Sequence, residues 1–302
     1  MEESVRSLLK KIPGVPRILR TNTYRRVRYE MTLRFQERRN YTFTRFFRLP
    51  TQFDALVGPV INFLLANRDR QSLSITVWGC SNGAEPYSIA SVLLRRCPKL
   101  DFTIQAFDID QQMLEKAGGG TYAREEVLSG SRMDTAFVEE TFLVEQTLYR
   151  VKSAISSRVR FGIKNVLDTH LENMAKCSDI VFAQNLLYHL KPDACKIAFN
   201  NVCRLLRSKA ALFVDGMDLD LRLRLTKIKG LEPLDYRIEE IHNEAKNERG
   251  SAWPYEYWGL ESFTTSRMNW KRRYSTIFLK NDSQSDPTQS DAMKFGPMVN
   301  NS

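Results

Sequence analysis

The stretch "SITVWGCSNGAEPYSIASVLLRRC", residues 74–97, joins two kinds of pattern. Its first residues are β-branched and aromatic, which is typical of a buried strand. From Glu85 onward the apolar residues recur at the spacing of one helix face. Between them lies a turn of small residues, Gly79, Ser81 and Gly83, where backbone can approach a ligand closely. The stretch therefore predicts a strand, a ligand-binding turn and a helix in direct succession.

The same alternation continues along the chain. Helices are expected from residue 111 and over 192–206, and further strands at 102–110, 158–166, 178–187, 210–217 and 273–280. Strands that alternate with helices imply a doubly wound, mostly parallel sheet with right-handed crossovers and helices on both faces. The predicted fold class is therefore α/β.

Composition narrows the class of protein. The chain has 302 residues, of which 42% are hydrophobic, enough for one large α/β domain and a small appendage. Its apolar stretches fall short of the ~20 residues that span a bilayer, and its first residues contain no apolar signal core. The five cysteines form no CxxC pair, which favours a reducing cytosol over disulfides or a metal site. We expect a cytoplasmic protein without a membrane span or a metal ion.

The net charge of +10 is concentrated at one end. Residues 1–50 contain 13 Lys and Arg against 4 Asp and Glu, with aromatic residues between the arginines. We interpret 1–42 as a basic, partly helical segment that meets an acidic partner or an anionic membrane surface, or simply as a solvated helix. The absence of an RNA- or DNA-binding signature argues against nucleic acid. Residues 281–302 are polar and predict a disordered tail.

The end of the second strand suggests the ligand. In doubly wound sheets, ligands bind at the carboxyl ends of the strands. Asp108 ends that strand more than twenty residues after the glycine turn, where an acid can accept hydrogen bonds from ribose hydroxyls. The turn lacks the full GxGxxG spacing, so a nucleoside without phosphates, such as S-adenosylmethionine, fits better than NAD. A purely structural glycine corner is the alternative.

Several motifs resemble those of one family, the CheR-type chemotaxis methyltransferases. The similarity runs from residue 43 to about 217 and rests on "FTRFFRLPTQFDAL" (43–56), "GCSNGAEPYSIA" (79–90), "FDIDQQMLEKAGGGTY" (107–122), "VRFGIKNVLD" (159–168) and "DIVFAQNLLYHL" (179–190). The resemblance implies a class I methyltransferase (Rossmann-like) domain over 43–280. It also implies S-adenosylmethionine as methyl donor, a carboxylate as acceptor, and a role in bacterial signalling.

Carried over position by position, the resemblance implies a set of cofactor-binding residues: Thr44, Arg48, Gly79, Gly83, Glu85, Asp108, Asn165, Val166, Gln184 and Asn185. Among these, Glu85 is expected to hold the methionine amino group and Asp108 the ribose. Arg48 is expected near the transferred methyl, where it orients the incoming carboxylate as a catalytic residue together with Tyr188 and His189.

Departures from the family bear on the acceptor. The family's Arg-Asn pair is Gln184-Asn185 here, its tyrosine falls on His189, and the segment before residue 43 is short. An insertion is expected at about 219–272. It contains the aromatic stretch "SAWPYEYWGLESF" (251–263), which suggests either a wall for an apolar substrate or a local core.

Three functions remain open at the level of sequence. The first, preferred on these departures, is a carboxyl O-methyltransferase for a non-receptor acid, such as a small molecule or a hydroxy-fatty-acid signal. The second is a chemotaxis-receptor protein-glutamate O-methyltransferase. The third is a nucleic-acid methyltransferase or a silent S-adenosylmethionine-binding module, although "AQNLLYHL" (183–190) lacks the NPPY-like motif of base-amine enzymes.

Overall fold

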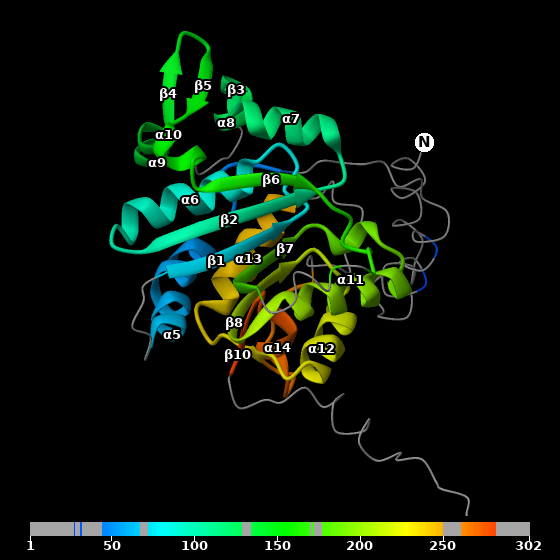
Figure 1. Ribbon diagram of the computed structural model, residues 1–302. Coiled ribbons are helices and arrows are strands. Elements are labelled where there is room, and N and C mark those ends of the chain that lie inside the picture. The colour runs from blue at the N-terminus through cyan, green and yellow to red at the C-terminus, as the bar shows by residue number, and fades with distance from the viewer. Residues whose placement is uncertain are drawn as a thin grey trace, which may run out of the picture.

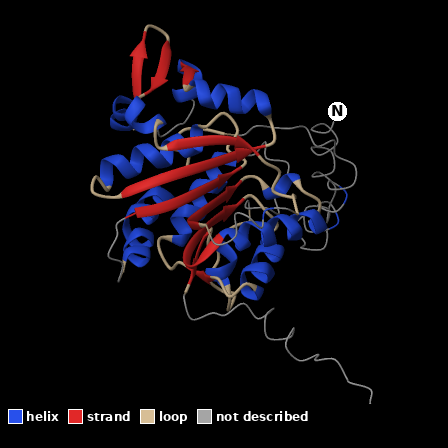
Figure 2. Cartoon of the chain, in the orientation of Figure 1, coloured by secondary structure: helices blue, strands red, loops and turns tan. Residues whose placement is uncertain are grey.

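A seven-stranded sheet in the order β6-β2-β1-β7-β8-β10-β9 forms the centre of the molecule (Figures 1 and 2). The computed structural model describes residues 44–66, 72–128, 134–169, 171, 177–249 and 261–281, besides the single residues 27 and 31. Five strands run parallel: β1 (Ser72–Trp78), β2 (Asp101–Asp108), β6 (Val159–Ile163), β7 (Ser178–Gln184) and β8 (Leu206–Asp215). β10 (Ile277–Lys280) runs antiparallel to β8 and to the short β9 (Glu232–Pro233).

The strand order reverses between β1 and β7. From β1 the chain moves outward to β2 and β6, and it then crosses to β7 on the other side of β1. Such a reversal opens a crevice at the carboxyl ends of the strands, because the two connecting segments leave in opposite directions. This is the place where the sequence predicts a ligand.

Alternate residues of each central strand enter two different cores. Ile75, Val77 and Phe182 belong to one hydrophobic cluster, whereas Trp78 and Val181 belong to the other. This follows from the period of two along a strand, which points successive side chains to opposite faces of the sheet. Both faces are therefore apolar, as expected for a mostly parallel sheet.

Helices cover both faces, which confirms the predicted α/β class. On one face lie α4 (Pro50–Ala55), its π-helical continuation η1 (Leu56–Val60), α5 (Ile61–Leu65), α6 (Ala84–Arg96) and α13 (Ile238–Arg249). On the other lie α11 (Pro192–Leu205) and α12 (Leu219–Ile228). The predicted helices at 85–97 and 192–206 correspond to α6 and α11, and the helix from residue 111 is α7 (Gln111–Gly119).

Strand boundaries are the least accurate part of the prediction. The expected strand at 273–280 is wrong in its first half, because residues 273 and 274 end α14 (Trp270–Tyr274) and only 277–280 pair with β8. The expected strand at 102–110 stops at Asp108, since Asp110 turns away and caps α7 by accepting from the amides of Gln112 and Met113.

A second, three-stranded antiparallel sheet was not predicted. It has the order β3-β5-β4 and consists of β3 (Thr121–Ala123), β4 (Phe142–Glu145) and β5 (Leu148–Val151). Short helices α8 (Arg124–Leu128), α9 (Thr135–Thr141) and α10 (Ser153–Ser156) accompany it, and it stands at the β6 side of the main sheet (Figure 1). Edge-to-face contacts join its Tyr122 and Phe142 to Phe46, with ring centroids 4.8 and 5.0 Å away.

Part of the expected insertion belongs to the main sheet. Its residues 219–249 supply α12, β9 and α13, which complete the two cores and one sheet edge. Trp253, Tyr255, Tyr257 and Trp258 of the aromatic stretch lie outside the described residues, as do 282–302 and all of 1–42 except residues 27 and 31. Phe263 is described and contacts the rings of His242, Trp270 and Tyr274. In the part of the chain that the structure describes, no helix is long and apolar enough to cross a membrane.

Candidate active site

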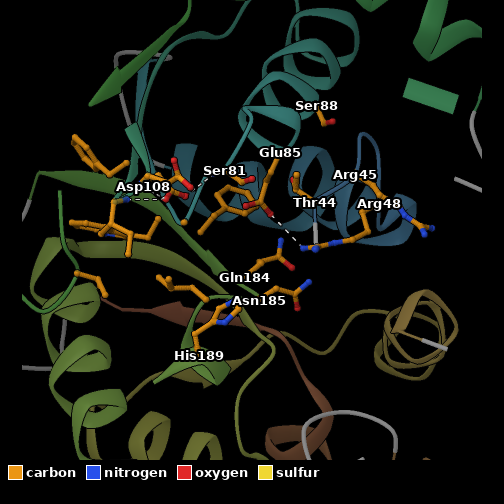
Figure 3. A pocket seen from close by; sticks show the side chains of 18 of the residues that line it. Thr44, Arg45, Arg48, Ser81, Glu85, Ser88, Asp108, Gln184, Asn185 and His189 are labelled. Carbon is orange, nitrogen blue, oxygen red and sulfur yellow. Dashed lines mark hydrogen bonds and ion pairs between the residues drawn. The ribbon is translucent and has the colours of Figure 1, made fainter. Parts of the chain in front are cut away.

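The pocket opens where the sequence places it, at the carboxyl ends of β1, β2 and β7. It extends from Asp108 at one end, past Ser81 and Glu85, to Arg45 and Arg48 at the other (Figure 3). Eleven of the residues singled out from the sequence line it: Thr44, Arg48, Gly79, Ser81, Glu85, Asp108, Asn165, Val166, Gln184, Asn185 and His189. Five separate segments of the chain contribute them.

Two glycines shape the turn after β1, each for a different reason. Gly79 has a φ of +70°, lines the pocket, and donates its N–H to Phe107 O at 2.8 Å. Gly83 has a φ of +86° and precedes α6, but it does not line the pocket. A Cβ at Gly83 would lie 3.0 Å from Ala117 Cβ and 3.1 Å from Phe161. Its place in the fold therefore reflects close packing of α6 rather than direct contact with a ligand.

Asp108 is held rigidly at the end of β2. One carboxylate oxygen accepts from the N–H of Ser81 at 2.7 Å, and the other accepts from the N–H groups of Ile109 and Asp110 at 2.8 and 3.0 Å. A carboxylate has about four acceptor positions, so these three bonds leave capacity for a ligand hydroxyl. The same bonds tie the glycine turn to the second strand.

Glu85 lies in the first turn of α6 with its side chain in the middle of the pocket (Figure 3). Burial raises the pKa of the Glu85 carboxyl to about 7, although the Arg48 guanidinium and a hydrogen bond from Gln184 oppose the rise. The Arg48 Nη2 to Glu85 Oε1 distance is 3.9 Å. A buried carboxylate of this kind is suited to a cationic ligand group, which would return the pKa toward its ordinary value.

Three buried polar atoms have no hydrogen-bond partner within the described residues and belong to residues that line this pocket. They are Trp78 Nε1, Ser81 Oγ and Gln184 Oε1. Leaving a buried polar atom unpaired costs about 1–3 kcal/mol, so native structures rarely leave several together without a ligand. All three atoms belong to residues of one pocket, which suits a pocket that binds a polar molecule.

Backbone strain is concentrated at the same place. Three non-glycine residues with positive φ line the pocket: Phe47 at +48°, Ser81 at +48° and Asn185 at +51°. The Asn185 conformation brings it against Gly216, where a Cβ would lie 2.6 Å from Asn185 Oδ1. Conformations of this kind cost about 1–3 kcal/mol each and persist where the surroundings fix them, commonly at binding sites.

Tyr188 and His189 are neighbours in sequence, but only one of them lines the pocket. His189 lines the pocket beside Asn185, whereas Tyr188 is buried and is not among the lining residues (Figure 3). The two rings contact each other with centroids 3.9 Å apart. Of this pair, His189 therefore occupies the position from which a side chain reaches a ligand.

Sequence reasoning missed several lining residues. Arg45, Ser88, Ile109 and Lys164 all border the pocket, and each lies next to or within a motif that was recognised. Ile109 is 65% exposed although it is large and apolar, which is typical of a residue that a ligand covers. Its position next to Asp108 is the sequence feature that could have identified Ile109 as a lining residue. The described residues contain no cluster of three or more side chains suited to hold a metal ion.

The fold and the pocket together define an S-adenosylmethionine-dependent class I methyltransferase. The sheet has the doubly wound order with one antiparallel strand near its edge, and the pocket at its carboxyl ends contains two acids, Asp108 at the end of β2 and the buried Glu85. The orphaned polar atoms and exposed Ile109 fit a nucleoside carrying an amino acid.

The particular family follows from sequence comparison. Residues 42–220, more than half of the chain, match the family model "CheR methyltransferase, SAM binding domain", and the chain belongs to this family. The resemblance seen in the motifs is thereby confirmed. S-adenosylmethionine is the cofactor of this domain.

Three relatives illustrate the similarity. A chemotaxis protein methyltransferase of Listeria monocytogenes is 27% identical over 66% of this chain and 69% of its own length. The "Probable biofilm formation methyltransferase WspC" of Pseudomonas putida is 30% identical over 63% of this chain and 44% of its own. Chemotaxis protein methyltransferase 2 of Vibrio cholerae is 31% identical over 57% and 60%, respectively. The chain thus spans about half the length of the last two.

Proposed function

We propose that this chain transfers a methyl group from S-adenosylmethionine to glutamate carboxylates of a chemoreceptor-like signalling protein. The family match and the names of the relatives support this alternative over a small-molecule or fatty-acid acceptor, for which no support was found. The aromatic stretch that had suggested an apolar acceptor lies largely outside the described residues. Carboxyl methylation and a protein acceptor are therefore proposed together.

One observation within the site carries the choice of a carboxylate. Arg45 and Arg48 lie at the end of the pocket away from Asp108, Asn185 and His189 line it between Asp108 and Arg48, and all four carry N–H groups that can donate hydrogen bonds (Figure 3). A carboxylate is ionised at neutral pH and needs no general base, so donors that orient it are sufficient. The acids that line the pocket are Glu85, Asp108 and Asp110, and the last two lie at the opposite end.

The cofactor residues divide along the length of the pocket. We propose that Asp108 accepts hydrogen bonds from the ribose, that Asn165 and Val166 contact the adenine with Ile109, and that Glu85 and Gln184 hold the methionine ammonium. Thr44, Gly79 and Asn185 complete the cradle. When bound, the cofactor supplies an electrophilic methyl on sulfur, while the chain's residues supply position and exclude water.

Arg48 is proposed to orient the acceptor. Its planar guanidinium can donate to both oxygens of a carboxylate, which fixes the direction of approach. His189 is proposed to donate to the second oxygen, in place of the family's tyrosine. Arg48 also neighbours Glu85. One side chain would therefore lie beside both the carboxylate proposed to hold the cofactor and the proposed position of the acceptor carboxylate.

The test uses S-adenosylmethionine labelled in its methyl group, incubated with the purified chain and chemoreceptor fragments that carry methylatable glutamates. We expect label on the receptor protein that alkali releases as methanol, because methyl esters are base-labile. Receptor fragments with those glutamates changed to alanine are the control. Label appearing only on free small acids, or only in an alkali-stable form, would refute the proposal.

A further inference from the structure

Helix α13 contacts the loop that carries Arg48, although the two are about 200 residues apart in the chain. Glu244 accepts from Thr51 twice, from Oγ1 at 2.7 Å and from the backbone N–H at 3.1 Å. Glu248 pairs with Arg45, with Arg45 Nη1 3.3 Å from its Oε2. The spacing of four residues places both carboxylates on the same side of α13.

The loop needs such a partner because its own sequence does not cap α4. Leu49 occupies the N-cap position and has no side-chain acceptor, and Pro50 follows it at the first helical position. The N–H of Thr51 points out of the helix end, and Glu244 satisfies it. A carboxylate at a helix N-terminus also interacts favourably with the helix dipole. Glu244 therefore acts as a cap supplied from another element.

The conformation of the loop is strained and fixed from several sides. Phe47 adopts a φ of +48° and donates its N–H to Ser88 Oγ at 2.9 Å, while its ring stacks on Phe53. Arg48 directly follows Phe47, so its reach toward Glu85 depends on how the loop is held. Neither Glu244 nor Glu248 lines the pocket.

We propose that Glu244 and Glu248 are positioning residues that hold the 44–51 loop so that Arg48 reaches its place beside Glu85. The inference rests on the proposed role of Arg48 as the residue that orients the acceptor. It adds a function for α13 that the family motifs, which end before this helix, do not contain.

The experiment compares Glu244→Gln and Glu248→Gln with the matched control Glu239→Gln, an exposed acid on the same helix. The conservative change keeps size and one acceptor oxygen but removes the charge. S-adenosylmethionine affinity is measured by calorimetry from pH 5.5 to 8.5. Methyl transfer to receptor fragments is measured at saturating cofactor.

Since Arg48 opposes the rise in the Glu85 pKa, its displacement should move the pH midpoint of cofactor binding upward, by up to about one pH unit. We expect this shift in Glu244→Gln, a smaller one in Glu248→Gln, and none in Glu239→Gln. The kcat should fall about tenfold in Glu244→Gln, while the cofactor affinity at pH 8.5 stays within about twofold of wild type, consistent with a loss of positioning worth about 1.4 kcal/mol.

The same shift must disappear when Arg48 is absent. In an Arg48→Ala background, adding Glu244→Gln should change the midpoint no further. An unchanged midpoint in Glu244→Gln, or an equal shift with and without Arg48, would overturn the inference. The pH midpoint depends only on cofactor binding, so it tests the positioning role of Glu244 even if the wild-type protein transfers no methyl group to receptor glutamates. Absence of methyl transfer by the wild type would refute the proposed function instead. Thr51→Val, which removes the Oγ1 donor alone, gives a second variant with an intermediate expected shift.

Discussion

Glu85 combines burial, a cationic neighbour and a central place in the pocket, and these features make cofactor binding sensitive to pH. Its raised pKa of about 7 means that the folded, cofactor-free protein binds this proton more tightly than the unfolded chain does. The folded state is therefore relatively more stable at low pH, and this stability is lost as pH rises through about 7, because ionising the buried Glu85 carboxyl is unfavourable. A ligand ammonium has the opposite preference, because it requires the ionised carboxylate.

We expect S-adenosylmethionine affinity to fall below pH 7 by up to about tenfold per pH unit, since one proton must leave Glu85 on binding. Above pH 8 the affinity should be nearly constant. Glu85→Gln should be weak at every pH and should lack this slope. Calorimetry across pH 5.5–8.5 measures both, and a wild-type slope that persists in Glu85→Gln would show that another group titrates.

Asp108 offers a second test at the level of one residue. Asp108→Ala removes the proposed charge-assisted acceptor for the ribose, worth about 1.5–3 kcal/mol, so S-adenosylmethionine affinity should fall more than tenfold. Asp101→Ala at the other end of β2, where the side chain is exposed, is the control and should bind like wild type. Equal affinities of Asp108→Ala and wild type would remove Asp108 from the cofactor site.

At the scale of elements, two glycines of different helices should change the free energy of unfolding in opposite directions when each is replaced by alanine. Gly83 has a φ of +86° and almost no space for a Cβ, whereas Gly118 lies within α7 with nothing within 4 Å of that position. Gly83→Ala should lower the free energy of unfolding by about 1–3 kcal/mol through strain. Gly118→Ala should raise it by about 0.5–1 kcal/mol through helix propensity.

Urea denaturation of the two variants measures the difference. If both changes destabilise equally, the packing argument for Gly83 does not hold. Calorimetry on the folded variants adds a second comparison: Gly83→Ala should affect cofactor affinity less than Asp108→Ala, since Gly83 does not line the pocket.

The helices α6 and α11 and the parallel strands were predicted, whereas α12, α13 and the small sheet were not. α6 and α11 show clear apolar periodicity because one face of each is buried, whereas a parallel strand such as β7 reads as a continuous apolar run because both of its faces are buried. The strands β3, β4 and β5 have three or four residues each, too few for a pattern to stand out, and their stability comes from contacts such as Phe142 against Phe46. The lining residues inside motifs were equally accessible from sequence, whereas Glu244 was not, since nothing near it indicates that it lies beside Thr51.

At the scale of the whole molecule, Phe46 links the Arg48 loop to the small sheet. It is 2% exposed and contacts both Tyr122 and Phe142. Phe46→Ala should lower the free energy of unfolding by about 3–5 kcal/mol by leaving a cavity. Val144→Ala, at a position 56% exposed on the same small sheet, is the control and should change it by less than about 0.5 kcal/mol.

Hydrogen exchange locates the effect of Phe46→Ala. Amides of β3 and β5 should exchange faster in this variant, while those of β7 and β8 in the main sheet should change only with global stability. Uniform acceleration across both sheets would mean that the small sheet does not open as a separate unit.

The contacts of α4 with residues far along the chain also determine when, during synthesis, the loop beside the pocket can be completed. Thr51 reaches Glu244, and Gln52 donates to Thr276 Oγ1 at 2.6 Å, so the loop beside the pocket is completed by residues 193 and 224 positions later. A ribosome that adds about 5–20 residues per second needs about 10–45 s to synthesise that interval. Glu85 and Asp108 are synthesised early in this interval, well before α13, the helix proposed to hold the loop that carries Arg48. The residues proposed to hold the methyl donor, the last of which is Asn185, are therefore synthesised before α13, the helix proposed to position Arg48, which belongs to the last quarter of the chain.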